Sequence, residues 1–392
     1  MKKLALTALS AALLTGCFGD DSSNNGNPVD TQGPIFIAQL ISADYLTSEI
    51  AIGTVSENEF VENYASQDAS DYTIDVYEQY LYHIGRGSID TLTRYDAAAE
   101  FLQEDYTYNL AEPESSSSNV YQILQVAEDK AYVLRYGKTS VQVVDPSADE
   151  ENFVLSEVEL AAYVAEGATY PRMYSAVVSD DKLFVGMQRL DANWQPTQSY
   201  VAVIDIATNT EIDTDAEDEG LKGIPLSADN LHSMALDDNY VYVAGRGNYS
   251  DNSGALDRIS LNDYSVNTLI DGSTFAALND DESGAYYHVL AVEVVGDTLF
   301  VQINLEGGEA PRGYIYSAPI SNPSSFTDVT PDAFAGEKIA TVQSGPDNTL
   351  WVSLDNAETP DVYVLNENAE VQGEALEFSM PVREIEFMDI QD

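Results

Sequence analysis

Short apolar stretches recur along this chain from residue 80 onward, and each carries an aromatic residue in its third position. Successive aromatic residues lie 50, 52, 58, 58 and 51 positions apart. Stretches this short, bounded by polar residues, are typical of β-strands and too short for helices. They cover residues 80–83, 130–133, 182–185, 240–243, 298–301 and 349–352. The pattern therefore predicts one structural unit that is repeated roughly every 50 residues.

Each stretch occupies the same place within its repeat. A polar pair that favours a tight turn precedes it, as at 180–181, and another apolar stretch precedes that turn, as at 175–178. A third stretch follows beyond a polar loop, and the clearest one covers residues 200–205. Two-residue turns join antiparallel strands. Antiparallel units of about four strands, repeated in series, are typical of a β-propeller.

The two ends of the chain together supply one more repeat. Residues 34–37 have the aromatic residue in place but no strand ahead of them, whereas residues 382–387 have the pattern of a first strand with a turn expected at 388–389. We therefore predict an all-β protein in which residues 34–392 form one seven-bladed β-propeller, closed by N- and C-terminal strands that share a blade. Six or eight blades, a β-sandwich and a solenoid are the alternatives, but a sandwich or a solenoid does not require both ends to complete one repeat.

The first residues predict export rather than a part of the fold. Lys2 and Lys3 precede a mostly apolar segment, residues 4–14, which as a helix would cross only about half of a bilayer core. The small residue Gly16 before the only cysteine, Cys17, resembles the bacterial lipobox. That resemblance implies a signal peptide at residues 1–16, acylation of Cys17 and a lipid anchor. The alternative is an ordinary secretory signal in which Cys17 is incidental.

The residues after Cys17 bear on location. In lipobox proteins an Asp directly after the cysteine favours the inner membrane, so Phe18 implies the outer membrane, without indicating which side the protein faces. Residues 17–33 are rich in Asp, Ser, Asn, Gly and Pro. Such a composition predicts a flexible tether between the acylated cysteine and the propeller.

The net charge of the chain limits the kinds of molecule that the protein is expected to bind. The chain has 67 Asp and Glu against 16 Lys and Arg, a formal net charge of −51, yet 44% of its residues are apolar. A folded core is therefore expected, and the excess of negative charge excludes nucleic acid as a partner. A surface of this kind stays hydrated at high ionic strength, which indicates a salt-tolerant Gram-negative source. One Cys excludes a disulfide framework. We expect a monomer without a cofactor.

Residues 200–212 resemble the repeat of the YVTN/YncE-like propellers, in which a strand ending in Val-Ile-Asp continues into a Thr-Asn-Thr turn. Residues 141–146 are a weaker copy. The resemblance implies the propeller fold and an exported binding or scaffold protein, since a fold alone does not fix function. Quinoprotein-type propellers carry a Trp- and Gly-containing repeat, which is missing because Trp194 and Trp351 are the only tryptophans.

The scarce basic residues are predicted to gather on one face. In a propeller the start of each innermost strand and the loop after each second strand lie on the same face, around the central channel. All three His and seven of nine Arg map to that face, whereas Arg94 and Arg258, on third strands, do not. The candidate ligand-binding residues are Tyr72, His83, Arg86, Gln122, Arg135, Arg172, Tyr174, Arg189, His232, Arg246, His288 and Arg383.

Such a face suits an anionic or aromatic small molecule, or a glycan, because guanidinium groups bind carboxylate or phosphate through paired hydrogen bonds. The competing interpretation is that these Arg residues neutralise neighbouring Asp and Glu. The predicted function is therefore a binding protein of the cell envelope. A protein–protein interaction scaffold of the outer membrane is the alternative.

No catalytic residue and no metal ligand is predicted. The chain lacks a Gly-x-Ser-x-Gly motif, and no two His lie one helical turn apart. A lactonase-like propeller would present carboxylate and Asn ligands in its channel, whereas the expected first residues of the inner strands are Tyr, Gln, His and Arg. A lactonase-like or quinoprotein-like enzyme remains the exception to this expectation.

Overall fold

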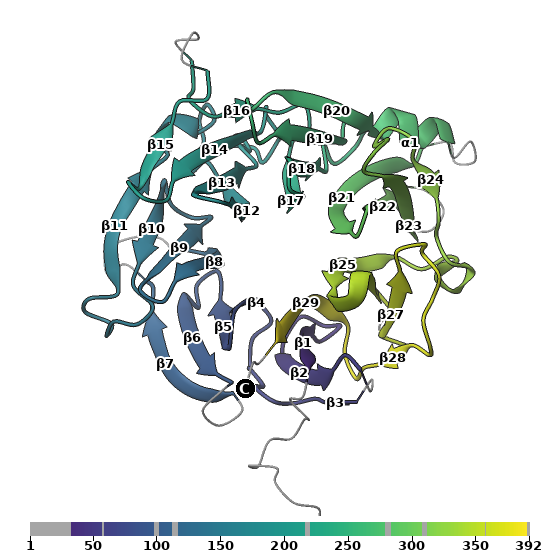
Figure 1. Ribbon diagram of the computed structural model, residues 1–392, viewed down its shortest axis with the longest axis horizontal. Helices are drawn as coiled ribbons and strands as arrows, with labels where there is room; N and C mark the ends of the chain where they lie inside the picture. The colour runs from purple at the N-terminus through teal and green to yellow at the C-terminus, as the bar shows by residue number, and fades with distance from the viewer. Residues whose placement is uncertain are drawn as a thin grey trace, which may run out of the picture.

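The chain folds into a ring of seven antiparallel blades around a central channel (Figure 1). This computed structural model describes residues 33–389 except 57–58, 98–101, 112–116, 216–219, 279–283, 308–311 and 357. The predicted seven-bladed propeller is confirmed. The predicted signal peptide (1–16), Cys17 and nearly all of the tether (17–33) lie outside the described residues. Within the described ranges, no helix has the length and apolar character needed to cross a membrane.

Six blades are built from strands that follow one another in sequence. Blade 1 comprises β4 (Tyr72–Tyr77), β5 (Tyr80–Gly85), β6 (Thr91–Asp96) and β7 (Gln103–Asn109), and blade 2 comprises β8 (Val120–Ala127), β9 (Lys130–Arg135), β10 (Ser140–Val144) and β11 (Val154–Glu159). Blade 3 comprises β12 (Met173–Ser179), β13 (Lys182–Met187), β14 (Tyr200–Asp205) and β15 (Thr210–Ile212), with β16 (Ile224–Pro225) beside β14.

The next three blades follow the same order. Blade 4 comprises β17 (Leu231–Leu236), β18 (Tyr240–Gly245), β19 (Ala255–Ser260) and β20 (Val266–Asp271), and the short helix α1 (Gly272–Leu278) follows it. Blade 5 comprises β21 (Tyr286–Val295), β22 (Thr298–Glu306), β23 (Arg312–Pro319) and β24 (Thr327–Asp328). Blade 6 comprises β25 (Ile339–Gly345), β26 (Thr349–Leu354), β27 (Asp361–Asn366) and β28 (Leu376–Glu377). Turns of 3-10 helix lie at Ala161–Tyr163, Asp332–Phe334 and Pro346–Asn348.

Blade 7 joins the two ends of the chain, as predicted. The C-terminal strand β29 (Val382–Asp389) is the innermost strand, and β1 (Pro34–Ile41), β2 (Ser48–Thr54) and β3 (Phe60–Val61) lie outside it in that order. Figure 1 shows the yellow C-terminal strand beside the purple N-terminal strands. The turn expected at 388–389 is wrong, because Met388 and Asp389 continue the strand and pair with Ile35 and Pro34.

The recurring aromatic residue holds neighbouring blades together. The second strand of each blade begins where the sequence pattern begins, and its third residue is at most 1% exposed. The seven residues are Phe36, Tyr82, Tyr132, Phe184, Tyr242, Phe300 and Trp351. Phe36 of blade 7 and Trp351 of blade 6, for example, have ring centroids 5.0 Å apart. Large aromatic side chains bury more apolar surface than other residues, so one per blade anchors each interface between blades.

The innermost strands share a local irregularity at the channel. In six of the seven, all within the described ranges, a β-bulge adds one unpaired residue near the start of the strand. The added residues are Tyr121, Tyr174, His232, Leu290, Ala340 and Arg383. A bulge redirects a side chain and ends regular pairing. The repeated bulge therefore sets which side chains meet at the channel mouth, the end of the channel at which the inner strands start.

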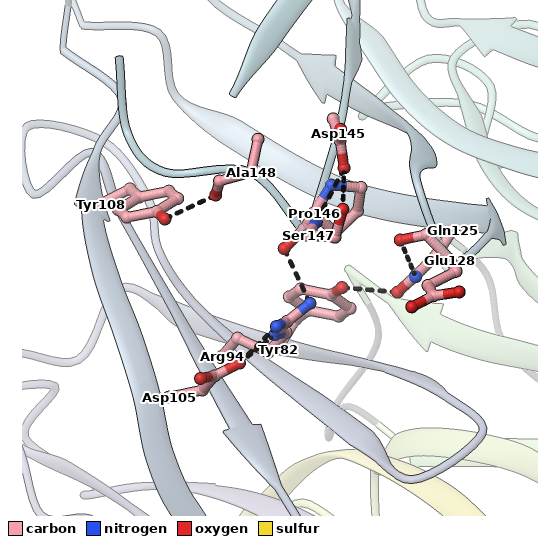
Figure 2. Close-up of polar contacts among 10 residues, drawn as sticks. All are labelled: Tyr82, Arg94, Asp105, Tyr108, Gln125, Glu128, Asp145, Pro146, Ser147 and Ala148. Atoms are coloured by element: carbon pink, nitrogen blue, oxygen red, sulfur yellow. Dashed lines mark hydrogen bonds and ion pairs between the residues drawn. The ribbon is translucent and has the colours of Figure 1, made fainter. Parts of the chain in front are cut away.

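At the opposite end of the strands, Arg94 connects blades 1 and 2 (Figure 2). Its Nη1 donates to the carbonyl of Pro146 at 2.7 Å, and its Nε donates to Asp105 at 2.9 Å. Tyr82 makes a parallel connection, because its hydroxyl donates to Gln125 Oε1 at 2.5 Å. All three guanidinium nitrogens of Arg94 donate hydrogen bonds within the protein. The arginines at the channel mouth can be compared with it on this point.

Candidate binding site

The central channel contains a cavity of about 610 Å³ lined by the innermost strands. All seven strands contribute, namely β4, β8, β12, β17, β21, β25 and β29. Cavities of roughly 300–1,000 Å³ are typical of small-molecule sites. The cavity is therefore large enough for a ligand, and its lining determines which kind.

One side of the mouth is an aromatic wall, which we define as Tyr121, Tyr136, Tyr174, Trp194 and His232. Tyr121 stacks on Tyr136 with ring centroids 4.8 Å apart, and Tyr174 lies 5.1 Å from Tyr121. His232 follows 5.1 Å beyond Tyr174. Tyr121, Tyr174 and His232 are bulged residues of consecutive inner strands. The shared bulge is thus what assembles side chains from three blades into one surface.

Arg172 completes the aromatic wall. Its guanidinium lies over Trp194 at 3.8 Å and over Tyr136 at 5.3 Å from the ring centroids. Both Arg172 and Trp194 have left-handed backbones with φ of 62°, a conformation that costs a non-glycine residue about 1–2 kcal/mol. Among the described residues, no carboxylate forms an ion pair with Arg172, and its buried Nε has no hydrogen-bond partner. Among the described residues, its guanidinium contacts the rings of Tyr136 and Trp194.

The other mouth arginines are bound within the protein. Arg86 pairs with Asp71 and Arg383 with Asp355, each at 2.8 Å. Arg246 lies 3.2 Å from Glu306, which also lies 3.5 Å from Lys338. Arg189 donates to the carbonyls of Tyr163 and Gln198. The ion-pairing interpretation of the sequence therefore fits Arg86, Arg246 and Arg383. Arg189 is held by backbone carbonyls instead, and Arg172 has neither kind of partner among the described residues.

The histidines add no positive charge at neutral pH. Burial lowers the pKa of His83 to about 4. Burial, together with the nearby Arg246 charge, lowers the pKa of His232 to about 4. The pKa of His288 is lowered as well, first by burial and then by Arg246. The positive potential of the mouth therefore comes from guanidinium groups and Lys338.

Deeper in the channel the lining becomes acidic. Asp75, Glu293, Glu384 and Glu386 all line the cavity. Burial raises the pKa of Glu293 to about 7, and burial together with the charges of Glu384 and Glu293 raises the pKa of Glu386 well above its usual range. Asp75 is shifted in the same direction, by burial and by the charges of Glu384 and Glu386. A negatively charged ligand group is therefore disfavoured beside these carboxyls inside the channel.

Three of these carboxylates also connect neighbouring blades. Glu384 accepts from the backbone N–H of Ile74 at 3.0 Å, and Asp75 accepts from that of Ile123 at 2.7 Å. Glu293 accepts from the N–H of Ser344 at 3.1 Å. Glu386 differs, because no hydrogen bond to its carboxyl group is formed by the described part of the chain. It is the channel carboxyl most available to a ligand.

The structure separates the twelve predicted site residues into three groups. Those lining the cavity are Tyr72, Arg86, Gln122, Tyr174, His232 and Arg383. Those on the mouth face outside the cavity lining are Arg172, Arg189 and Arg246. Those enclosed within the blades are His83, Arg135 and His288, which are at most 1% exposed. Arg135 pairs there with Glu157 at 2.9 Å.

The residue expected first in β8 is displaced by one position. Counting back from the turn predicted Gln122, but β8 has two bulges, and the one near its end shifts the first channel residue to Tyr121. Gln122 still lines the channel, where its Oε1 accepts from the N–H of Ala176 at 2.9 Å. Bulges are not visible in a period-two pattern, so the sequence did not place Tyr121.

Sequence reasoning also missed the acidic interior, because it considered only the first residues of the inner strands. Asp75, Glu293, Glu384 and Glu386 interrupt apolar inner strands at 72–77, 291–294 and 382–387. A charged residue inside such a strand was the available signal. Within the described ranges, no three His, Cys, Asp or Glu are grouped so as to hold a metal ion.

Comparisons with known proteins show the fold. No family model matches the chain and no curated protein matches it, so the resemblance of residues 200–212 to the YVTN/YncE-like repeat stays a prediction. A candidate 6-phosphogluconolactonase from Bacteroides uniformis is similar with a TM-score of 0.61 at 10% identity, covering 91% of this chain and 99% of that one. Another from Bacteroides fragilis has a TM-score of 0.56 at 12% identity, covering 94% and 99%.

A quinoprotein alcohol dehydrogenase-like protein from Bacteroides thetaiotaomicron is also similar, with a TM-score of 0.53 at 13% identity, covering 89% of this chain and 77% of that one. At such identities the likeness shows a shared β-propeller architecture and does not transfer residues or activity.

Proposed function

We propose that this protein is a non-catalytic binding protein of the cell envelope that holds a small anionic ligand at the mouth of its channel. The observation that carries the proposal is Arg172, whose guanidinium lies on Tyr136 and Trp194 and has no carboxylate partner among the described residues. A cation left unpaired in a chain of net charge −51 is available to a ligand carboxylate or phosphate.

The surroundings support the same ligand class. The aromatic wall connects Arg172 to the cavity of about 610 Å³, because Tyr136 stacks on Tyr121, which lines the cavity. The acidic interior disfavours a ligand that is negatively charged throughout. A small molecule with its charge at one end is therefore favoured over a polyanion.

Thermal unfolding with a panel of small anions, glycans and neutral sugars tests the proposal. A ligand that binds only the folded state raises Tm by mass action. We expect at least one small anion to raise Tm, and Arg172→Ala to remove that rise. Arg258→Ala is the matched control, because Arg258 lies over Tyr240 at 4.2 Å on a third strand, away from the mouth. No rise with any anion, or an equal rise in Arg172→Ala, contradicts the proposal.

The envelope location is proposed from the lipobox resemblance alone. We expect the wild-type chain to fractionate with outer membranes and to incorporate labelled palmitate at Cys17. Cys17→Ser should release the protein into the soluble fraction without changing the Tm of the propeller. Membrane association that survives this substitution contradicts lipid anchoring through Cys17.

The alternative, a scaffold for another envelope protein, is favoured by one observation. Tyr45, Leu46 and Tyr249 lie in loops of the mouth face and are 60%, 65% and 45% exposed. A photo-crosslinking residue at Leu46 should capture a defined partner if the scaffold interpretation holds. The same residue at Leu155, which is 56% exposed on the outer strand β11, is the matched control.

A further inference from the structure

The channel mouth changes character along its depth. At the surface, Arg172 and Trp194 stack together, and Arg86 lies over Tyr121 at 4.9 Å. Next come the ring faces of Tyr121 and Tyr174, which line the cavity. Below them, Glu384 and Glu386 follow Arg383 along β29. The order from outside to inside is therefore guanidinium, aromatic ring and carboxyl.

The geometry of β29 gives the depth of Glu386 below the level of Arg383 at the mouth. Glu386 follows Arg383 by three residues, which corresponds to about 10 Å along a β-strand. Because no described residue makes a hydrogen bond to Glu386, its carboxyl group can bond to a group of the ligand. A hydroxyl group suits a carboxyl group in either protonation state, since a hydroxyl both donates and accepts.

Resting on the proposed function, we propose that the ligand is a hydroxylated aromatic acid. Its carboxylate binds Arg172 at the mouth, and its ring packs against the aromatic wall. Its hydroxyl group points into the channel and bonds to Glu386. Each part of such a molecule meets the part of the mouth that complements it, and its single charge stays outside the acidic interior.

A larger occupant is less well matched. A polyanion places further negative charges in a buried region where burial and neighbouring carboxylates already raise the pKa values of Asp75 and Glu386. An aliphatic acid makes no ring–ring contact with the aromatic wall. An aromatic amine would place a positive charge beside the guanidinium of Arg172, and the two like charges repel each other. The aromatic acid with a distal hydroxyl group is the class that avoids all three mismatches.

Four related probes separate the three contacts, with the full-length protein purified in detergent and binding measured by calorimetry. The reference probe is para-hydroxycinnamate. Cinnamate lacks the hydroxyl group, and the methyl ester of para-hydroxycinnamate lacks the charge. Cyclohexylpropanoate lacks both the hydroxyl group and the aromatic ring, so it is compared with cinnamate. We expect loss of the hydroxyl group or of the charge to weaken binding about tenfold, the effect of losing one hydrogen bond to a charged or buried partner. Loss of the ring should weaken binding further, because the ring–ring contact is removed.

Protein variants assign each contact to a residue. In Arg172→Ala the acid and its methyl ester should bind equally weakly. In Glu386→Met the acid and cinnamate should bind equally, because the hydroxyl group has lost its partner. Glu386→Gln keeps a polar group and serves as the second variant if the methionine variant fails to fold. Glu374→Gln, on the exposed surface, should leave all affinities unchanged.

Four outcomes overturn the inference. Equal affinity for para-hydroxycinnamate and cinnamate in the wild-type protein removes the role of the hydroxyl group. An unchanged preference for the hydroxylated acid in Glu386→Met removes the role of Glu386. Binding of phosphate or citrate without binding of any aromatic acid overturns this inference but leaves the proposed function standing, and absence of binding by all anions overturns both.

Discussion

At the scale of single residues, the channel carboxyls are held in an unfavourable environment. Burial raises the pKa of Glu293 from 4.5 to about 7, although Ser344 donates hydrogen bonds to it. The folded protein therefore binds a proton that the unfolded chain has already released between these pH values. Stability falls as the pH rises through this window, and the cost is fully present above the folded-state pKa.

Replacing this carboxyl should remove the cost. We expect Glu293→Gln to raise the free energy of unfolding, relative to wild type, by at most about 3 kcal/mol near pH 8 and by almost nothing near pH 4. The amide oxygen of Gln can still accept from the N–H of Ser344. Denaturant unfolding at several pH values measures the difference, with the exposed Glu374→Gln as control. A gain that is independent of pH contradicts the assignment.

Single residues also show how far the sequence predicted which side chains lie at the channel mouth. The clustering of Arg, Tyr and His on one face follows from strand order, and the structure places Tyr72, Arg86, Tyr174 and His232 together at the cavity. Which arginine keeps a free charge was not predictable. That depends on whether a loop carboxylate such as Asp71 reaches the guanidinium, and loop conformations are not encoded in a local pattern.

At the scale of elements, every innermost strand is an edge strand. One side of it pairs with the second strand of its blade, and the other side faces the channel with unpaired N–H groups. Side chains from the preceding blade satisfy several of them, as Glu384 does for Ile74 and Asp75 for Ile123. The polar residues inside these strands thus stabilise the ring as well as line the cavity.

This role predicts a difference between two substitutions of Glu384. Its carboxylate also accepts from the hydroxyl of Thr73 at 2.5 Å. We expect Glu384→Ala to lower the free energy of unfolding by about 1–3 kcal/mol, since it leaves a buried N–H without a partner. Glu384→Gln keeps an acceptor oxygen and should lose less. Faster hydrogen exchange at the amide of Ile74 in the alanine variant is the local measurement, and unchanged exchange would argue against this contact.

At the scale of the whole molecule, charge and closure dominate. The chain has a formal net charge of −51, so repulsion among surface carboxylates opposes the folded state at low ionic strength. Closure of the ring stabilises the fold against this repulsion. The strands β29 and β1 pair along seven register positions, from Pro34 with Asp389 to Leu40 with Val382.

Salt should therefore stabilise this protein. Screening shortens the Debye length from about 10 Å at 0.1 M to about 3 Å at 1 M salt. We expect Tm to rise by several degrees over that range, equally with sodium and potassium chloride. A Tm that stays constant or falls would show that carboxylate repulsion does not limit stability.

The sequence by itself determined the architecture. A stretch with an aromatic third residue, repeated roughly every 50 positions, can bury its aromatic side chain only against the next copy, and the two incomplete ends can complete only each other. Those relations depend on chain order and period, so they are readable without coordinates. The start of each second strand and the shared blade followed from them.

Only the tertiary structure decided what the channel mouth is. Bulges within blades 2, 3 and 4 present Tyr121, Tyr174 and His232. The acidic interior and the contact of Arg172 with Tyr136 arise where separate blades meet. Such contacts depend on the register within a blade and on how far each loop reaches, and a shift of one residue exchanges the side chains that face the channel. The repeat therefore specifies the ring, whereas contacts between blades specify what the ring can bind.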